Sequence, residues 1–361
     1  MRICFLNHDL DDRKGAGRFG VNFISRLRQA RPDIQCTVLT SAGSGHPLEE
    51  AILYPSKVKF LLALPRIRAV FRHCDLIHAL DGWPYGVIAA LASLGLGKKL
   101  VITAIGTGAV QPLYRPYGWL VAWAYRRASR VVAISSNTRR EILARVPDVA
   151  ITVINHAVDA GEFSGDLSIA LTAEERSAIR ALKPYVLSVG GWKRRKGFQY
   201  SFAAFAEMKK RFPELSYVIC GIGPKPQLEE PLGLGGAVSY FKNIRWPFLK
   251  AIYAGAELFF LLPVDDSKDI EGFGFAFLEA AAAGLPVIGT RDSGAEDALS
   301  DGVNGFLVPP RDADAAAEAA IRILSDAQLR ERFRAASLAF AREMTWERVT
   351  SSYQRLYAEI I

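Results

Sequence analysis

The chain has 361 residues, of which 50% are hydrophobic and 23% are charged, and its formal net charge at pH 7 is +8. This length predicts two domains, and the composition is typical of a globular protein rather than a disordered one. No run of about 18 uncharged apolar residues occurs, so no helix is expected to span a membrane. Residues 1–6 are mostly apolar and are soon followed by aspartates, which predicts a first β-strand rather than a signal peptide, and hence a cytoplasmic protein.

Short β-rich runs alternate with helix-sized segments through the first half of the chain. We expect strands at residues 3–6, 35–40, 75–79, 99–104, 130–134 and 151–154. A glycine-rich loop that leads into an amphipathic helix is expected over residues 15–30. This alternation is typical of a parallel, doubly wound sheet.

A polar stretch over residues 159–183 interrupts the alternation, and we place the domain junction within it, after residue 165. A second alternation follows, with strands expected at residues 185–189, 216–220, 238–241, 258–262, 287–290 and 305–308. Apolar side chains at helical spacing over residues 346–357 predict a closing helix. The sequence therefore predicts an α/β protein with two Rossmann-like, doubly wound domains, residues 1–165 and 166–345, that face a cleft.

The charge balance and the cysteines restrict the classes of partner and of site. Residues 1–165 carry a balance of +9, from 21 Lys and Arg against 12 Asp and Glu, whereas the remainder carries −1. A basic first domain indicates an anionic partner, such as a membrane surface or a lipid phosphate, or else a solvated basic surface. Nucleic acid is disfavoured because no recognised binding module occurs. The four cysteines, Cys4, Cys36, Cys74 and Cys220, are far apart, which predicts buried free thiols rather than disulfides or a metal site.

One stretch places two acids on either side of a pair of glycines. Glu271 and Glu279 lie eight positions apart, and Gly272 and Gly274 lie between them, after one predicted strand and before another. If a helix begins near Gly274, its first-turn N–H groups converge on one point, which suits a phosphate. Two acids beside a phosphate are explained if they bind hydroxyls, so the pattern predicts a sugar and a ribose on one diphosphate. The alternative is a structural strand-to-helix turn with Glu271 as a solvated cap and Glu279 on the surface.

Segments along the whole chain resemble the retaining glycosyltransferases of family four, the group 1 glycosyl transferases with the GT-B fold. The segments that carry the resemblance are residues 131–139, 153–159, 188–197, 262–263, 271–280, 284–287, 301–309 and 346–357. The resemblance implies that the last helix, residues 346–361, crosses back onto the first domain. It also implies transfer of a hexose-type sugar from a nucleotide-sugar, such as a UDP- or GDP-sugar, to a saccharide acceptor.

The resemblance assigns the donor site to the second domain. Lys196 is expected to be the main cation against the donor diphosphate, so that no metal ion and no other cofactor is required. Glu279 is expected to bind the ribose, and Glu271 to bind the donor sugar or to stabilise its developing positive charge. Lys196 and Glu271 are thus the expected catalytic residues of a front-face displacement, in which the leaving phosphate takes the acceptor's proton. The other expected donor-binding residues are Gly190, Gly191, Lys193, Arg194, Gly272, Phe273, Gly274 and Phe275.

The resemblance assigns the acceptor and a phosphate-approaching loop to the first domain. The matching positions are Gly15, Gly17, Arg18, Gly106 and Thr107. His78, at an expected strand end, is either a further candidate for this site or a hydrogen-bonded structural residue. Ile105 stands where the family usually has a histidine that contacts the donor sugar, so this part of the sugar site departs from the pattern. Gly191 stands where many members have arginine, and Lys193 or Arg194 is expected to supply that charge.

The acceptor class depends on a segment in which aromatic residues alternate with arginines, residues 114–127. A helix there is expected either to lie in a membrane interface or to face the core. With the basic first domain it favours an acceptor on an anionic lipid, such as a lipid-linked saccharide or a lipopolysaccharide core, and a protein peripheral to the inner face of the plasma membrane. A sugar-nucleotide epimerase and a non-catalytic GT-B homologue stay open as alternatives. A dinucleotide-dependent dehydrogenase is disfavoured, because the second strand ends without the acid that holds a ribose.

Overall fold

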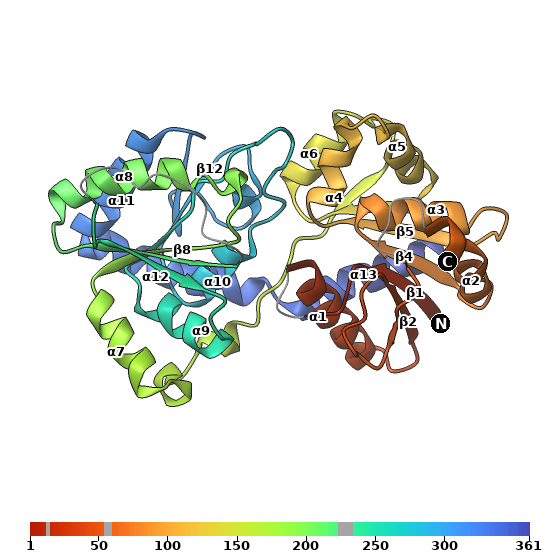
Figure 1. Ribbon diagram of the computed structural model, residues 1–361, viewed down its shortest axis with the longest axis horizontal. Coiled ribbons are helices and arrows are strands. Elements are labelled where there is room, and N and C mark those ends of the chain that lie inside the picture. Colours follow the sequence, from red (N-terminus) through yellow and green to blue (C-terminus); the bar gives the residue numbers. More distant parts are fainter. Residues whose placement is uncertain (12–14, 54–59, 223–233) are drawn as a thin grey trace. The chain divides into compact units, whose positions relative to one another are not determined.

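The structure, a computed structural model, describes residues 1–11, 15–53, 60–222 and 234–361. The chain folds into two compact units (Figure 1). The first unit comprises Met1–His156, Ser267–Gly272 and Trp346–Ile361, and the second comprises Ala157–Asp266 and Phe273–Thr345. The chain therefore passes from one unit to the other four times.

The first unit ends earlier than the boundary expected at residue 165, because the next residues pack with the second unit. The backbone N–H of Val158 donates a 2.9 Å hydrogen bond to the carbonyl of Met344. The Phe163 ring packs edge-on against Tyr253, with 5.9 Å between the ring centroids. Polar composition alone marked a junction in this region but did not show which side its apolar residues would join.

Seven parallel strands form the sheet of the first unit, in the order β3-β2-β1-β4-β5-β6-β7. Their bounds are β1 Arg2–Asn7, β2 Gln35–Thr40, β3 Glu49–Glu50, β4 Leu76–Leu80, β5 Lys99–Ala104, β6 Arg130–Ala133 and β7 Ile151–Val153. All of β4 is buried, as expected for a parallel strand covered on both faces. The sequence missed β3, because two successive glutamates give no strand periodicity.

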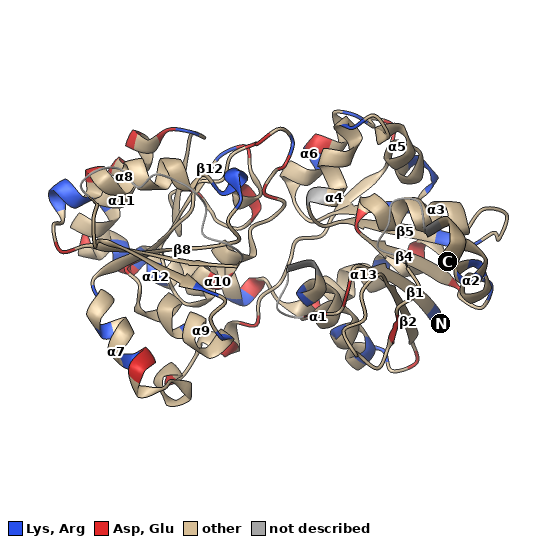
Figure 2. Cartoon of the chain, in the orientation of Figure 1, with Lys and Arg blue, Asp and Glu red and all other residues tan. Residues whose placement is uncertain are grey.

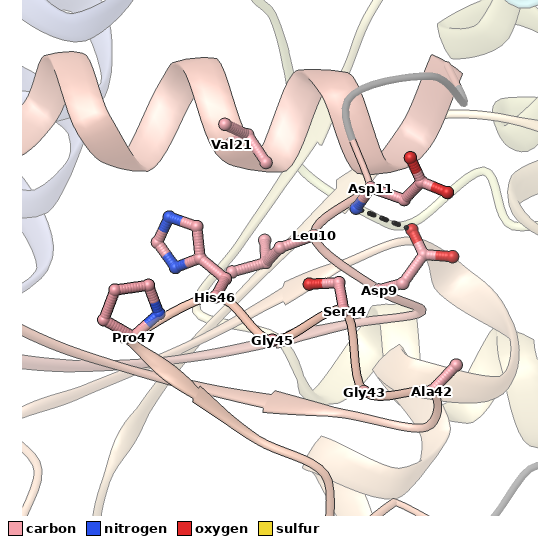
Figure 3. Close-up of a pocket in the computed structure, with 10 residues that line it drawn as sticks. All are labelled: Asp9, Leu10, Asp11, Val21, Ala42, Gly43, Ser44, Gly45, His46 and Pro47. Atoms are coloured by element: carbon pink, nitrogen blue, oxygen red, sulfur yellow. Dashed lines mark hydrogen bonds between the residues drawn. The ribbon is translucent and has the colours of Figure 1, made fainter.

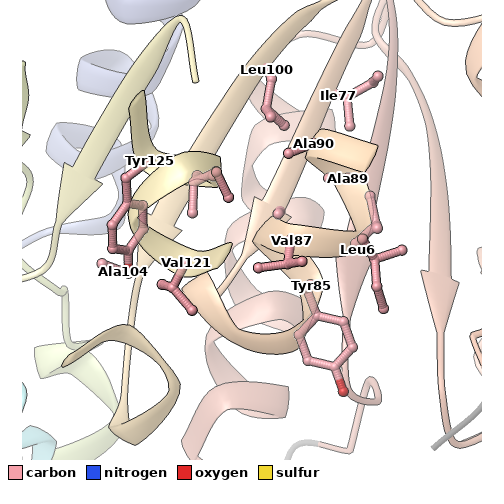
Figure 4. Close-up of a cluster of buried hydrophobic side chains, with 14 of the residues drawn as sticks. Leu6, Ile77, Tyr85, Val87, Ala89, Ala90, Leu100, Ala104, Val121 and Tyr125 are labelled. Carbon is pink, nitrogen blue, oxygen red and sulfur yellow. The ribbon is translucent and has the colours of Figure 1, made fainter. Parts of the chain in front are cut away.

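Helices pack on both faces of this first sheet (Figure 1). Their bounds are α1 Gly15–Ala30, α2 Phe60–Arg72, α3 Val87–Ala92, α4 Thr107–Val110, α5 Gly118–Arg127, α6 Ser136–Leu143 and α13 Trp346–Ile360, with short turns η1 Gly82–Gly86 and η2 Gln111–Tyr114. In one buried cluster Ile77 and Leu100 of the sheet pack with Ala90 of α3 and Val121 of α5 (Figure 4). Burial of such side chains is the main source of stability in this layer.

The closing helix α13 packs with the first unit, as predicted, and completes a buried hydrogen-bond network there. The Tyr357 hydroxyl lies 2.7 Å from His78 Nδ1, and Thr103 Oγ1 lies 2.7 Å from His78 Nε2. Thr103 Oγ1 also lies 2.9 Å from the Tyr353 hydroxyl. Of the two alternatives for His78, the structural one therefore holds, and the assignment of His78 to a site at a strand end is wrong. It lies in the middle of β4 with both ring nitrogens engaged, and its partners are more than 20 residues away in sequence, where no local pattern reveals them.

Burial keeps His78 uncharged in the folded protein. It lowers the pKa of His78 from 6.5 to about 3, because a charged imidazole would lose its hydration. Below pH 6.5 the unfolded chain takes up a proton that the folded protein does not. The contribution of His78 to stability is therefore complete above the unfolded pKa and is lost as the pH falls towards 3.

Six parallel strands form the sheet of the second unit, in the order β10-β9-β8-β11-β12-β13. Their bounds are β8 Tyr185–Val189, β9 Ser216–Gly221, β10 Val238–Lys242, β11 Leu258–Phe260, β12 Val287–Thr290 and β13 Gly305–Val308. Each was predicted from the sequence. The helices are α7 Ala173–Leu182, α8 Phe198–Arg211, α9 Trp246–Gly255, α10 Phe275–Ala282, α11 Ala313–Ser325 and α12 Ala327–Glu343, with turns η3 Ala160–Phe163, η4 Leu167–Ala170, η5 Arg194–Lys196 and η6 Gly294–Asp297.

Both sheets contain a point at which the strand order reverses. In the first sheet β1 pairs with β2 on one side and with β4 on the other, and in the second β8 pairs with both β9 and β11. Doubly wound sheets bind ligands outside the carboxyl ends of the strands at such points. Ligand sites are therefore expected at the loops after β1 and β4, and at the loops after β8 and β11. The prediction of two doubly wound α/β domains is confirmed.

The cysteines are free thiols that contribute mainly to packing. Cys4, Cys74 and Cys220 are buried, as predicted, and Cys36 is half-buried. Burial raises the pKa of Cys220 well above its usual range and that of Cys36 to about 11. Both thiols are therefore protonated at neutral pH and poor nucleophiles.

No helix within the described ranges has the length and apolar character that crossing a bilayer requires.

Tyr357→Phe is expected to destabilise the first unit. It leaves one buried ring nitrogen of His78 without its hydroxyl partner, at a cost of about 1–3 kcal/mol. Urea unfolding of the variant and the wild type measures this difference. Ser351→Ala, at an exposed position of the same helix, is the matched control and should change stability by less than about 0.5 kcal/mol. Equal stability of Tyr357→Phe and the wild type would show that the hydrogen bond between Tyr357 and His78 contributes nothing.

Candidate functional site

Helix α10 begins where the spacing of the two acids predicts, and it buries the second acid. Gly274 caps the helix and Phe275 opens it. Glu279 lies on the second turn and is only 7% exposed, and its Oε2 accepts a 2.9 Å hydrogen bond from the Tyr253 hydroxyl. The alternative in which Glu279 is a surface residue is thereby excluded. Tyr253 fixes one carboxylate oxygen at the start of a helix whose dipole favours negative charge nearby.

The loop after β8 carries a buried lysine. Lys196 ends the turn η5 and is 7% exposed. Its side chain runs along the backbone of Gly190, where an added Cβ would lie 3.0 Å from Lys196 Cε and 3.3 Å from Nζ. A side chain at residue 190 would therefore push the ammonium group away. Within the same loop Lys193 and Arg194 are exposed, and Gly191 is half-exposed.

The basic loop and the chain that leaves β11 meet at the carboxyl edge of the second sheet. The backbone N–H of Val264, past the end of β11, donates a 2.8 Å hydrogen bond to the carbonyl of Arg195. Since β8 and β11 are neighbours, this contact lies at the reversal point of the sheet. A buried ammonium group at this edge is suited to bind an anion such as a diphosphate.

The first acid of the motif packs with the other unit. Glu271 is 7% exposed, and with Gly272 it belongs to the segment Ser267–Gly272 of the first unit. Phe273, Gly274 and Phe275 follow in the second unit, where the Phe273 and Phe275 rings pack edge-on at 6.3 Å. The sequence placed both acids in the second domain. Instead, the change of unit falls between Gly272 and Phe273, because Ile270 is buried in the core of the first unit.

The residues expected in the acceptor loop occupy the start of α1. Gly15 opens this helix, and Gly17 and Arg18 lie in its first turn. In the sequence, residues 8–14 separate the helix from the end of β1. Gly17 is buried against residues 9–11, where an added Cβ would lie 2.5 Å from Asp9 Oδ1. Lys14, which precedes this turn, lies outside the described residues.

Gly106 and Thr107 lie at the end of β5, where Gly106 caps the short helix α4 and Thr107 opens it. Asp81, at the end of β4, holds this turn: its carboxylate accepts hydrogen bonds from the backbone N–H groups of Gly82, Gly106 and Ile105. Burial raises the pKa of Asp81 to about 7 despite these bonds. The sequence did not single out Asp81, because a lone acid after a strand is common in loops.

A second group that sequence reasoning missed lies at the reversal point of the first sheet. His8 follows β1, Ser41 follows β2 and Tyr85 lies after β4. Ser41 Oγ lies 3.0 Å from His8 Nδ1 and 3.0 Å from the Tyr85 hydroxyl, and the His8 and Tyr85 groups lie 2.9 Å apart. Three polar side chains from three strand ends thus form one cluster. The topology of β2-β1-β4 brings them together, and only their positions just after predicted strands hinted at it.

A pocket of about 660 Å³ is lined partly by the residues that follow His8 and Ser41 in the sequence (Figure 3). It is lined by Asp9, Leu10, Asp11, Val21, Ala42, Gly43, Ser44, Gly45, His46 and Pro47. The backbone N–H of Asp11 donates a 3.2 Å hydrogen bond to Asp9 Oδ1, which turns the chain at the rim (Figure 3). The lining thus combines two carboxylates with a hydroxyl and an imidazole.

Comparison with known proteins follows the division into two units. The family model described as glycosyl transferases group 1 matches residues 172–339, and the model described as glycosyltransferase family 4 matches residues 13–162. Between them the two models match most of each unit. The chain belongs to the group 1 glycosyltransferases.

This glycosyltransferase has relatives of named activity. It is 28% identical over 288 residues to the GDP-mannose-dependent alpha-(1-6)-phosphatidylinositol monomannoside mannosyltransferase of Mycolicibacterium smegmatis, with 73% of each chain covered. It is 28% identical over 284 residues to the alpha-D-kanosaminyltransferase of Streptomyces kanamyceticus, with 73% of this chain and 69% of that protein covered. Among solved structures, Anabaena HepE in complex with UDP and glucose shares 18% identity and a TM-score of 0.81 over 99% of this chain and 100% of HepE. The predicted GT-B fold is confirmed.

Proposed function

We propose that this glycosyltransferase moves a hexose-type sugar from a UDP- or GDP-sugar to a saccharide acceptor, with retention of the anomeric configuration. The observation that carries the proposal is the buried Lys196 in the loop after β8, in the same unit as the buried Glu279 on α10. The mannosyltransferase relative depends on GDP-mannose by its name, and HepE binds UDP and glucose. These two proteins support a nucleotide-sugar donor with either uracil or guanine as its base, and they do not decide between the two bases.

The proposed donor site separates charge from hydroxyl recognition. The diphosphate carries at least two negative charges, so Lys196 and the first turn of α10 are assigned to it, and no metal ion is invoked. Glu279 is assigned to the ribose, because a carboxylate accepts hydrogen bonds from hydroxyls. Lys193 and Arg194 are exposed on the same loop and are assigned to the outer phosphate oxygens.

The proposed reaction is a displacement on one face of the sugar. The bond from the anomeric carbon to the phosphate oxygen breaks, and a bond from that carbon to the acceptor oxygen forms on the same face. The acceptor hydroxyl proton passes to the departing phosphate oxygen, so no protein base is consumed. Glu271 is assigned to the sugar, where its charge stabilises the positive charge that develops on the ring.

Variants of the two acids are expected to separate binding from turnover. Glu279→Ala should weaken nucleotide binding about tenfold or more, because hydrogen bonds from hydroxyls to a charged acceptor are lost. Glu271→Gln should lower kcat about 100-fold with little change in nucleotide affinity, because it acts on the developing charge. Calorimetry with UDP, GDP and ADP, and assay of the matching sugar nucleotides with NMR of the product's anomeric configuration, measure these effects.

Glu318→Gln, an exposed acid on α11, is the matched control for both acids. Negligible effects of both Glu271→Gln and Glu279→Ala would refute the assignment of the site. An inverted product would refute retention alone.

We further propose that the pocket beside α1 receives the acceptor. It lies at the reversal point of the first sheet, next to the expected glycine turn of Gly15 and Gly17. Asp9 and Asp11 contribute two carboxylates to its wall, and hydroxyl-rich or amino-bearing groups suit such a wall better than a phosphate does. We therefore assign a sugar or cyclitol ring of the acceptor to the pocket, and any acceptor phosphate to the solvent outside it.

Asp11→Asn is expected to raise the acceptor KM about fivefold to tenfold while the nucleotide affinity stays the same, because a charged hydrogen-bond acceptor is lost. Steady-state kinetics with a panel of neutral, amino and phosphorylated sugars measure the effect and rank the acceptor classes. Glu50→Gln, an exposed acid on β3 outside the pocket, is the control. Preference for phosphorylated sugars, unchanged by Asp11→Asn, would refute the assignment.

We also propose that the acceptor is carried on a lipid, as part of lipopolysaccharide or other polysaccharide synthesis, and that the protein works peripherally at the inner face of the plasma membrane. Trp119 of α5 is 68% exposed and Leu62 of α2 is 75% exposed. Helix α5 nevertheless buries Val121 and Tyr125, so it faces the core on one side and solvent on the other. Lys and Arg residues lie on several helices of the first unit, including both of these (Figure 2).

Binding to vesicles tests this membrane proposal. The protein should bind vesicles of anionic phospholipid at low salt, bind neutral vesicles less, and dissociate as salt rises. The double variant Leu62→Ser/Trp119→Ser should weaken that binding about tenfold, because two exposed apolar anchors are lost. Leu338→Ser, at an exposed apolar position of α12 in the second unit, is the control. If anionic vesicles are not bound and activity ignores lipid on the acceptor, the proposal is wrong.

A further inference from the structure

The segment that carries Glu271 is fixed to the first unit at three points. Lys268 Nζ lies 3.1 Å from Glu141 Oε2 of α6 and 5.4 Å from the centre of the Tyr114 ring. Ile270 is 6% exposed and belongs to the main core cluster of this unit. At the third point two hydroxyls bind the carbonyl of Gly272, the residue next to Glu271.

The two hydroxyls belong to Ser135 and Thr138 at the start of α6. Ser135 Oγ lies 2.5 Å from the Gly272 carbonyl oxygen and Thr138 Oγ1 lies 3.2 Å from it. Ser135 Oγ also accepts a 2.9 Å hydrogen bond from the backbone N–H of Thr138, and Ser135 thereby caps the N-terminus of α6. The hydroxyl of Ser135 has one proton to donate, and its shortest contact is with the Gly272 carbonyl. Thr138 Oγ1 lies 3.0 Å from Ser135 Oγ, and its own proton can point to Ser135 or to Gly272. Ser135 is thus the principal donor.

Gly272 can reach these hydroxyls because it has no side chain. A Cβ added there would lie 2.8 Å from the carbonyl oxygen of Ile105 and 3.1 Å from Cδ1 of Ile134. Ile105 follows β5 and Ile134 follows β6, so Gly272 is seated at the carboxyl edge of the first sheet. The close contact at the α-carbon and the hydroxyl pair at the carbonyl are separate observations that constrain the same residue, Gly272.

We infer that Ser135 and Thr138 are positioning residues that hold the backbone of Glu271 through the carbonyl of Gly272. The inference rests on the proposed role of Glu271 at the donor sugar. Ser135 is 0% exposed and Thr138 is 1% exposed, so neither is available to touch a substrate. The sequence indicated no function for the family segment 131–139, and the positioning of Glu271 supplies one. The first unit, and not helix α10, sets the position of Glu271.

Ser135→Ala is expected to lower kcat about 10- to 100-fold, because a misplacement of about 1 Å at the reacting centre has effects of that size. Nucleotide affinity should change less than about twofold, because Lys196 and Glu279 belong to the other unit. Thr138→Val should have a smaller effect, and Ser135→Thr should restore most of the activity by supplying a hydroxyl again. Ser136→Ala, exposed at the next position of α6, is the matched control.

A double-mutant cycle with Glu271→Gln distinguishes positioning from a general structural role. If Ser135 acts through Glu271, Ser135→Ala should lower kcat by less than about twofold in the Glu271→Gln background. Full multiplication of the two effects would overturn the inference, whatever the loss in melting temperature from the missing helix cap. If Ser135→Ala does not fold, Gly272→Ala serves in the same cycle, because its Cβ forces the peptide away from Ile105. Normal turnover of Glu271→Gln alone would overturn the role of Glu271 instead.

Discussion

Parallel pairing on both sides of β1 and of β8 determines where this protein gathers its polar groups. The central strands β4, β8 and β11 are buried on both faces, and their side chains are mostly apolar. Polar side chains come together where the strands end, and at a reversal point the helices leave on opposite faces and make room. The cluster of His8, Ser41 and Tyr85 lies at one such point, and Lys196 lies at the other.

The second unit contains the buried charged side chains Lys196 and Glu279. A buried ammonium group and a buried carboxylate are costly to desolvate, and proteins keep such groups where a partner or a ligand compensates. The Tyr253 hydroxyl donates a hydrogen bond to one carboxylate oxygen of Glu279. Gly190, which has no side chain, leaves room for Lys196 to pack along its backbone. The proposed ligand, with a diphosphate at one end and hydroxyls at the other, would offer an anion to Lys196 and hydrogen-bond donors to Glu279.

The sequence predicted most of the fold because strands and helices leave local signals. The runs that became β2, β5, β8 and β12 have the predicted bounds, and α10 begins beside Gly274 as the acid spacing required. Contacts between distant residues left no such signal. The sequence did not decide between a site role and a structural role for His78, because its partners Tyr357 and Thr103 are distant in sequence. Likewise, the unit to which Glu271 belongs depends on Ile270, Ser135 and Thr138, and chain order cannot show where these pack.

The return of α13 to the first unit has a consequence for the order of folding during synthesis. Domains generally fold as they emerge from the ribosome, beginning with the amino-terminal one. Here the first unit is synthesised first but lacks Tyr353 and Tyr357, and with them the partners of Thr103 and His78, until the second unit has been made. The first unit can thus begin to fold early, but it is complete only when α13 has been synthesised. Most of the second unit is synthesised before that point.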